Sequence, residues 1–158
     1  MRKDIKINLK SKDDYINNYN KEILSYDLSN YILEETKGIP IKDKLRFIVS
    51  NDFEMTERET NEMVDMIRNN FGNDISEIMQ LYKKQTLANG LIFIVGLILL
   101  VLYPLLTEIV LSEFVLIFCW LLIGEAICNF FYKGIEYRYK VARRKQIVNA
   151  KILFDTRK

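Results

Sequence analysis

The sequence predicts an integral membrane protein, in which a hairpin of two transmembrane α-helices carries a small cytosolic α+β domain formed from both chain ends. The first observation behind this prediction is that residues 85–132 contain no lysine or arginine and only three acids. The second is that the net charge is −2 over residues 1–87, −3 over 88–132 and +7 over 133–158. The third is that both ends of the chain hold short segments with the periodicity of strands and helices.

The composition excludes several function classes. The chain has no histidine, so catalysis by histidine, Ser-His-Asp triads and most zinc sites are ruled out. The two cysteines, Cys119 and Cys128, match no metal motif, and the six glycines form no phosphate-binding loop. The first residues lack the apolar segment of a cleavable signal peptide. We therefore expect no enzyme, no metal and no cofactor.

The amino-terminal end begins with a predicted strand over residues 4–10, where apolar and polar side chains alternate. The next segment, 11–26, is rich in Asn, Tyr and Asp. We interpret it as a helix capped by Ser11 and Asp14. A second helix is predicted over residues 27–37.

Asp27 is the expected N-cap of the helix over 27–37, and Gly38 with Pro40 ends it. Leucine, tyrosine and isoleucine side chains form an apolar stripe along this helix. A second strand is predicted over residues 44–50, with the sequence KLRFIVS.

A capping box occupies residues 56–59 (TERE), where the threonine and the second glutamate satisfy each other's backbone N–H groups. It predicts a helix over 56–71 that buries one apolar face and ends at Gly72. A further helix is expected to start at Asp74 or Ser76 and to continue into the first apolar segment.

A helix needs about 20 apolar residues to cross a hydrocarbon core of about 30 Å. Residues 87–106 and 114–132 each supply such a segment, and the short link 107–113 makes them an antiparallel hairpin. Pro104 and Thr107 lie where the first helix should end. Buried helices of a soluble protein are the alternative, but so small a chain has almost no protein to bury them.

The flanking charges predict the orientation of the hairpin. The link carries the acids Glu108 and Glu113 and no base, whereas lysines and arginines flank the opposite ends of both segments. The positive-inside rule therefore places both termini in the cytosol, and the protein in the cell (inner or plasma) membrane. The cytosolic domain is predicted to comprise residues 1–86 and 133–158, on either side of hairpin residues 87–132.

Glu125 is the most informative residue of the sequence, because it lies two positions from the midpoint of residues 114–132. An ionised carboxylate at such a depth costs about 2.5–3.5 kcal/mol, so it must be protonated, paired or in contact with water. Asn129 shares its helix face, and Gly124 permits close approach of another helix. We expect these residues to line a pore or an inter-subunit contact. A polar clamp within the hairpin, for example to Asn89, and snorkelling toward Lys133 are alternatives.

Residues 133–149 are predicted to continue the second span as a basic helix. Its cationic side chains are expected to contact lipid headgroups or an anionic ligand, although positive-inside topology alone also explains them. These residues are Lys133, Arg138, Lys140, Arg143, Arg144 and Lys145. The terminal segment 150–154 (AKILF) is short and apolar, so we expect it to join the strands over 4–10 and 44–50 in one sheet. The helices over 27–37 and 56–71 would then cover one face of this sheet.

Several motifs resemble those of small bacterial two-span proteins: the DLSNYI helix, the KLRFIV strand, the TERE cap, the LLIGEAICNFF span and the terminal AKILF. More loosely, the architecture is similar to membrane effectors of anti-phage systems, such as the channel subunit of the Hailong system. The resemblance implies a homo-oligomeric channel that responds to a nucleotide or nucleic-acid signal. It assigns a role to no single residue.

Two function classes stay open at this point. The first is a homo-oligomeric effector or ion channel gated by a cytosolic ligand, such as a nucleotide or oligonucleotide, because both spans connect to one cytosolic domain. The second is a non-enzymatic membrane anchor or scaffold, which docks a cytosolic protein partner on its sheet edge or helix faces. A membrane-embedded enzyme would need a second ionisable group near Glu125, and the spans supply none beyond Cys119, Cys128 and Asn129.

Overall fold

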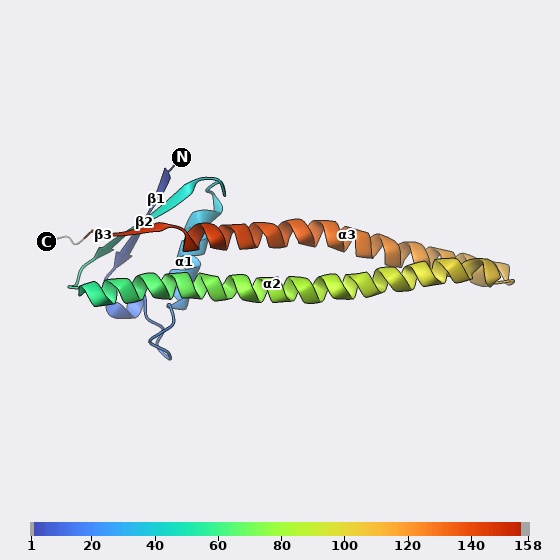
Figure 1. Cartoon of the computed structure of the whole chain (residues 1–158), viewed down its shortest axis with the longest axis horizontal. Helices are drawn as coiled ribbons and strands as arrows, with labels where there is room; N and C mark the ends of the chain where they lie inside the picture. Colours follow the sequence, from blue (N-terminus) through green and yellow to red (C-terminus); the bar gives the residue numbers. More distant parts are fainter. Residues whose placement is uncertain (1, 156–158) are drawn as a thin grey trace. The chain divides into compact units, whose positions relative to one another are not determined.

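The computed structural model describes residues 2–155, which form two compact units (Figure 1). The α+β unit comprises the residues up to Ser76 and those from Val141 onward, and the hairpin unit comprises Glu77–Lys140. The elements are β1 (Arg2–Leu9), η1 (Lys12–Asp14), α1 (Tyr26–Lys37), β2 (Lys44–Asn51), α2 (Glu57–Leu102), η2 (Tyr103–Leu105), α3 (Ile109–Val148) and β3 (Lys151–Asp155). Both α2 and α3 continue without a break from one unit into the other.

The three strands form one parallel sheet in the order β1-β2-β3. Ile5 lies beside Phe47, and Phe47 lies beside Ile152, so the two ends of the chain meet in the same sheet. This confirms the predicted sheet built from both chain ends. The whole hairpin unit lies between β2 and β3 in the sequence, where it forms part of the connection that parallel strands require.

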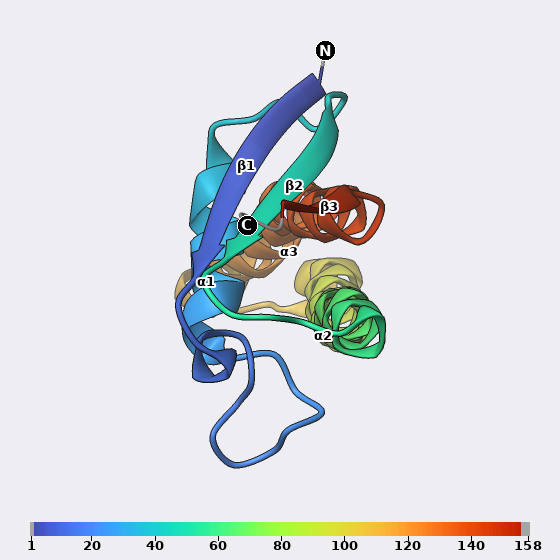
Figure 2. The ribbon, with the colours of Figure 1, turned by 90° about the vertical axis from the view of Figure 1, so that its left-hand side faces the viewer.

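The core of the α+β unit lies between one face of this sheet and the helices. Alternate residues of β1 and β2 are buried, as expected for strands with one covered face. In Figure 2, α1 lies along β1 and β2. The first turns of α2 and the last turns of α3 also contribute to the core. The buried apolar side chains from these helices are Leu28, Ile32, Met63, Ile67, Phe71 and Ile147.

The predicted helix break at Gly72 is wrong, because α2 continues through this residue. A glycine in a helix interior costs about 1 kcal/mol relative to alanine. Complete burial of the neighbouring Phe71 in the core outweighs this cost. Asp74 and Ser76, the expected starts of a new helix, also lie inside α2. Asp74 accepts a hydrogen bond from Arg144 of α3 at 2.9 Å.

The N-cap of α1 is Ser25, and the predicted cap Asp27 lies inside the helix. The Ser25 hydroxyl accepts a hydrogen bond from the Leu28 N–H at 3.3 Å and donates one to the Asp14 carbonyl at 2.6 Å. It therefore caps α1 and fixes the preceding loop at the same time. Gly38 is the C-cap of α1, as predicted.

The predicted helix over residues 11–26 is wrong except for η1, a single 3-10 turn whose N-cap is Ser11. The side chains of Asn17 and Asn20 accept hydrogen bonds from backbone N–H groups two or three residues further along. Such local bonds compete with helix formation. Most of this segment is therefore irregular.

The capping box at the start of α2 is confirmed. The Thr56 N–H donates to Glu59 Oε2 at 2.9 Å, and the Glu59 N–H donates to Thr56 Oγ1 at 3.3 Å. Lys12 of η1 forms an ion pair with the same carboxylate. The hydrogen bonds from Lys12 and Thr56 lower the pKa of Glu59 to about 2.

We expect Glu59→Gln to destabilise the protein at neutral pH, by an amount that shrinks in acid. The pKa of Glu59 is lower in the folded protein, at about 2, than its ordinary value of 4.5. The ionised carboxylate therefore stabilises the fold above about pH 4.5, and this contribution is lost as the pH falls toward 2. Thermal unfolding of both proteins across this pH range is the measurement. Glu54→Gln, at an exposed acid outside the cap, is the matched control; equal stability of Glu59→Gln and the unchanged protein at pH 7 would contradict the expectation.

The link between the long helices is shorter than the predicted 107–113, because α3 already starts at Ile109. Pro104 lies in η2, where its missing N–H group ends α2, as predicted. The Ser112 N–H donates to the Glu108 carbonyl at 2.9 Å, and the Ser112 hydroxyl donates to the Ile109 carbonyl at 2.7 Å. Residues 109–113 of the predicted link therefore form the start of α3.

Candidate functional site

The two helices of the hairpin unit pack through small residues. Gly96 of α2 lies so close to α3 that an added Cβ would be 2.8 Å from Cγ1 of Ile123 and 3.5 Å from its backbone nitrogen. On α3, Cys119, Ala126 and Gly134 are buried, at spacings of seven and eight residues that place them on one helix face. Small side chains at such a contact let two helix backbones approach each other.

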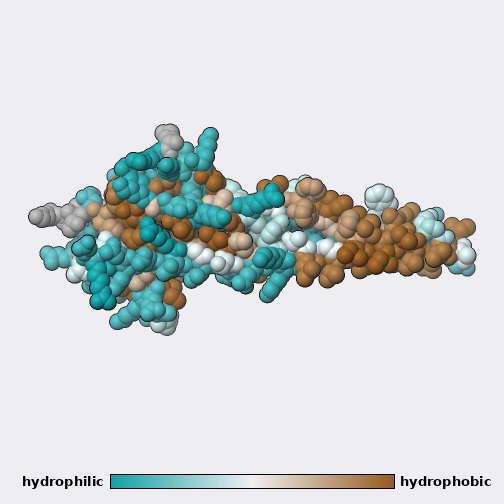
Figure 3. Space-filling model, in the orientation of Figure 1, coloured by the Kyte–Doolittle hydropathy of each residue, from teal (hydrophilic) through white to brown (hydrophobic). Residues whose placement is uncertain are grey.

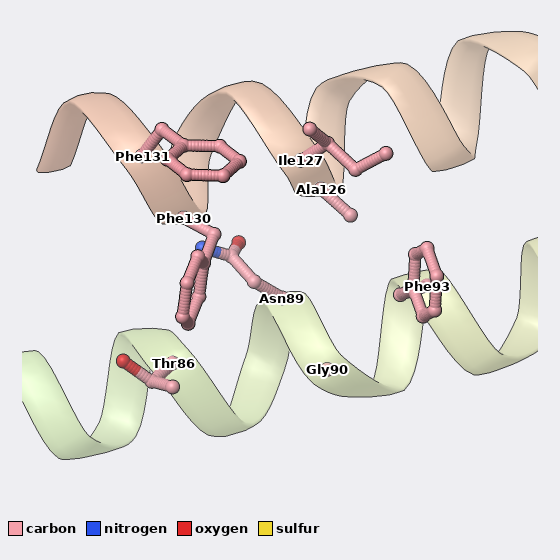
Figure 4. Close-up of a pocket in the computed structure, with 8 residues that line it drawn as sticks. All are labelled: Thr86, Asn89, Gly90, Phe93, Ala126, Ile127, Phe130 and Phe131. Carbon is pink, nitrogen blue, oxygen red and sulfur yellow. The ribbon is translucent and has the colours of Figure 1, made fainter. Parts of the chain in front are cut away.

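A groove of about 280 Å³ lies between α2 and α3 beside Asn89 (Figure 4). Asn89 is only 6% exposed, and its side-chain oxygen accepts a long hydrogen bond of 3.5 Å from Gln85, one turn earlier on α2. The lining residues are Thr86, Asn89, Gly90 and Phe93 of α2, with Ala126, Ile127, Phe130 and Phe131 of α3. The groove is therefore mainly apolar.

Glu125 lies on the surface of α3, and its side chain is exposed. Within residues 2–155, its carboxylate takes part in no hydrogen bond or ion pair. Asn129, one turn later, is half-buried, and a Cβ added to Gly124 would meet no atom within 4 Å. The clamp to Asn89 is therefore not formed. We call Gly124, Glu125 and Asn129 the polar face of α3.

In Figure 3, apolar side chains dominate the visible surface of the hairpin unit over the middle of its helices, and hydrophilic side chains lie toward the two ends. The most apolar 18-residue windows of the two helices have mean hydropathies of 2.4 and 2.2, and 11% of each window is buried. A core helix of a soluble protein would be mostly buried. Large apolar side chains are exposed on both helices, and these include Val101, Phe114, Trp120, Leu121 and Phe131. Both helices are thus long and apolar enough to cross a membrane.

Three of the six predicted basic contacts lie in the hairpin unit. Lys133 is half-buried and Arg138 is exposed. Lys140 forms an ion pair with Glu136 at 2.6 Å and lies 6.0 Å from the ring centroid of Tyr137. The hydrogen bond from Lys140 lowers the pKa of Glu136.

Arg143 and Arg144 instead hold the α+β unit together. Arg143 is 5% exposed and donates to Gln146 Oε1 at 2.7 Å and to the Lys37 carbonyl at 3.4 Å. Arg144 donates to Asp74 at 2.9 Å. These bonds join the end of α3 to α1 and α2. The headgroup or ligand contact of these two arginines stays a prediction.

An open cleft of about 580 Å³ lies in the α+β unit beside the start of β2. Lys42, Lys44 and Lys145 line it together with a single acid, Asp43, and we call these three lysines the basic cleft. The Gln146 amide donates to two carbonyl groups of the loop before β2, at 2.7 and 2.9 Å, which fixes this loop on α3. Lys145 is the one predicted ligand contact that lines this cleft.

Sequence reasoning missed three residues of these sites. Gly96 is one of six glycines, and the sequence does not reveal which of them meets the other helix. Lys42 and Lys44 belong to no binding motif, and their proximity to α3 depends on the fold of the loop before β2. Comparisons of the chain with protein-family models, curated proteins and solved structures give no match. The polar face of α3 and the basic cleft are the two features of the chain that bear on its function.

Proposed function

We propose that this chain is an integral membrane protein whose hairpin crosses the cell membrane with both termini in the cytosol. The low burial of two long apolar helices supports this proposal. The acids near the turn and the bases at the opposite ends support the orientation. Insertion would also remove from water the apolar surface that the hairpin unit exposes.

Within this proposal, several copies of the chain assemble around a pore that the polar face lines. The observation that carries this step is the exposed carboxylate of Glu125 in an apolar segment of α3. An ionised carboxylate facing lipid costs about 2.5–3.5 kcal/mol, and contact with water in a pore avoids this cost. Two helices cannot enclose a pore, so conduction requires several copies. A ring of Glu125 carboxylates, with Asn129 one turn away, favours cations.

The basic cleft is the proposed regulatory site. Its three lysines attract anionic groups such as the phosphates of a nucleotide or oligonucleotide. Lys145 belongs to α3, and this helix continues without a break to the polar face. A ligand that moves the end of α3 can therefore act on the pore. The resemblance to membrane effectors of anti-phage systems supports a channel that responds to such a signal.

Recordings from planar lipid bilayers test this function. Purified full-length chain is expected to give cation-selective currents after addition of ATP or a short single-stranded oligonucleotide on the side of the termini. Absence of current under all conditions, together with a monomeric state in detergent, would contradict the proposed function. Co-purification of a stoichiometric cytosolic protein in that case would favour a membrane anchor.

Reversing the charge of the cleft should weaken the response to the added anion. We expect Lys44→Glu combined with Lys145→Glu to raise the half-maximal concentration of the nucleotide or oligonucleotide at least about tenfold, because each charge-assisted contact contributes about 1.5–3 kcal/mol. Current against ligand concentration in the same bilayers is the measurement. Lys21→Glu combined with Arg68→Glu, an equal change of charge at two exposed positions outside the cleft, is the control. An equal shift in both variants would point to a general charge effect and would contradict a site in the cleft.

A further inference from the structure

β3 is an outermost strand of the sheet, with β2 as its one neighbour among residues 2–155. Its outer edge therefore presents backbone N–H and C=O groups to which no described strand pairs. The three central side chains, Ile152, Leu153 and Phe154, are apolar and only half-buried. A strand of this kind readily pairs with another strand.

The opposite edge of the sheet, β1, is protected against such pairing. It carries exposed charged side chains, which discourage the addition of a further strand. These residues are Arg2, Lys3, Asp4 and Lys6. In β3 the charges lie only at the two ends, at Lys151 and Asp155. This difference identifies β3 as the edge that is suited to pairing.

The sequence of β3 is complementary to itself in the antiparallel direction. When Leu153 lies opposite Leu153 of a second copy, Lys151 lies opposite Asp155 of that copy, and Ile152 lies opposite its Phe154. We propose that β3 pairs in this register with β3 of a second copy, about a twofold axis, to form a continuous six-stranded sheet. The pairing is isologous, as expected for a symmetric dimer.

The register follows from the faces of the sheet and from charge. Side chains directly opposite each other in an antiparallel pair lie on the same face of the sheet. When a residue of β3 lies opposite the same residue of the second copy, the helix-covered faces of both sheets therefore lie on the same side. Centring the pair on Ile152 would place Lys151 opposite Leu153, without a charged partner. Centring it on Leu153 alone gives opposite charges at both ends of β3.

The charges of β2 favour the same arrangement. Arg46 lies beside Lys151 in the sheet, so two positive side chains are neighbours. The Asp4 carboxylate, on the far side, already accepts hydrogen bonds from Arg46, including one of 2.8 Å. Asp155 of the second copy would supply the opposite charge beside Lys151. Along the row across the interface, the two bases Arg46 and Lys151 would then lie between two acids.

Cysteine cross-linking tests the pairing directly. In a full-length chain with Cys119→Ala and Cys128→Ser, Leu153→Cys should give a disulfide-linked dimer in membranes on mild oxidation, because opposite Cα atoms lie about 4.5–5.5 Å apart. Ile48→Cys is the matched control, since Ile48 is the register partner of Leu153 on β2 and is also half-buried. Two copies of Ile48 would lie three strand spacings apart, about 14 Å, beyond disulfide reach. We expect at least about tenfold more dimer from Leu153→Cys; equal yields would overturn the pairing.

A charge swap separates the pairing from a failure to fold. Lys151→Asp should place two acids opposite each other and reduce Leu153→Cys cross-linking severalfold, as should Asp155→Lys. The double variant restores opposite charges and should restore the dimer. Failure of the double variant to do so, or cross-linking of Leu153→Cys to a different protein, would overturn the proposal.

This inference refines the homo-oligomer of the proposed function, and the two fail in different ways. Loss of the β3 dimer with persistence of a Glu125-dependent current would contradict only the pairing of β3. A β3 dimer without any current would contradict only the pore.

Discussion

Glu125→Gln is expected to lower the cation current through the assembled protein by at least about tenfold while leaving the oligomer intact. The substitution removes the charge of the polar face but keeps a side chain that forms hydrogen bonds. In the proposed pore a ring of these carboxylates attracts cations, and this attraction is lost with the charge. A change of about 1.4 kcal/mol in the barrier is sufficient for a tenfold change in rate.

The measurement is single-channel recording in planar bilayers, with the oligomeric state determined in detergent. Glu113→Gln is the matched control, because it removes an exposed acid from the same helix close to the turn. Unchanged conductance and cation selectivity in Glu125→Gln would contradict the role of the polar face. Glu125→Ala, which also removes the hydrogen-bonding group, should in addition weaken the oligomer if this residue contacts other copies.

Gly96→Leu is expected to destabilise the hairpin by about 1–3 kcal/mol or more, because it overpacks the contact between α2 and α3. The first added atom would already lie 2.8 Å from Cγ1 of Ile123 and 3.4 Å from Cβ of Leu122. The side chain of Ile123 could move, but its backbone nitrogen at 3.5 Å leaves little room for the rest of a leucine. The two helices must then separate along this contact.

Thermal unfolding in detergent measures this effect, as a fall of several degrees in the midpoint. Gly90→Leu is the matched control, because Gly90 lies on the same helix and a Cβ there meets no atom within 4 Å. It should leave the midpoint unchanged or raise it, since leucine favours the helix more than glycine does. Equal midpoints for the two variants would show that Gly96 does not form a close helix contact.

The sequence correctly predicted those helices and strands whose residue periodicity and capping residues match the burial seen in the structure. The strands over 4–10 and 44–50 were predicted from their residue pattern, and alternation of apolar and polar side chains indicates a half-buried strand. The strand over 150–154 was predicted because so short an apolar segment needs a neighbouring strand to cover it. The capping box at Thr56 was found because two side chains at a fixed spacing satisfy two backbone groups. These features depend on neighbours in the sequence.

The errors concern residues whose role depends on distant parts of the chain. Gly72 was expected to end a helix, but burial of Phe71 against the sheet keeps α2 continuous. Gly96, Lys42 and Lys44 were missed for the same reason. Gly96 meets Ile123 of α3, and the two lysines line one cleft with Lys145. Sequence alone gives the type of these residues but not the surface that each one meets.

Labelling of single cysteines tests the central proposal, a hairpin that crosses the membrane with both ends in the cytosol. Thr107→Cys in the turn, and Ser11→Cys and Asn149→Cys in the α+β unit, all lie at exposed positions. In a chain without native cysteines, a membrane-impermeant maleimide should label Thr107→Cys in intact spheroplasts, and the other two only after permeabilisation. Labelling of all three before permeabilisation, or recovery of the chain in the soluble fraction, would contradict the proposal.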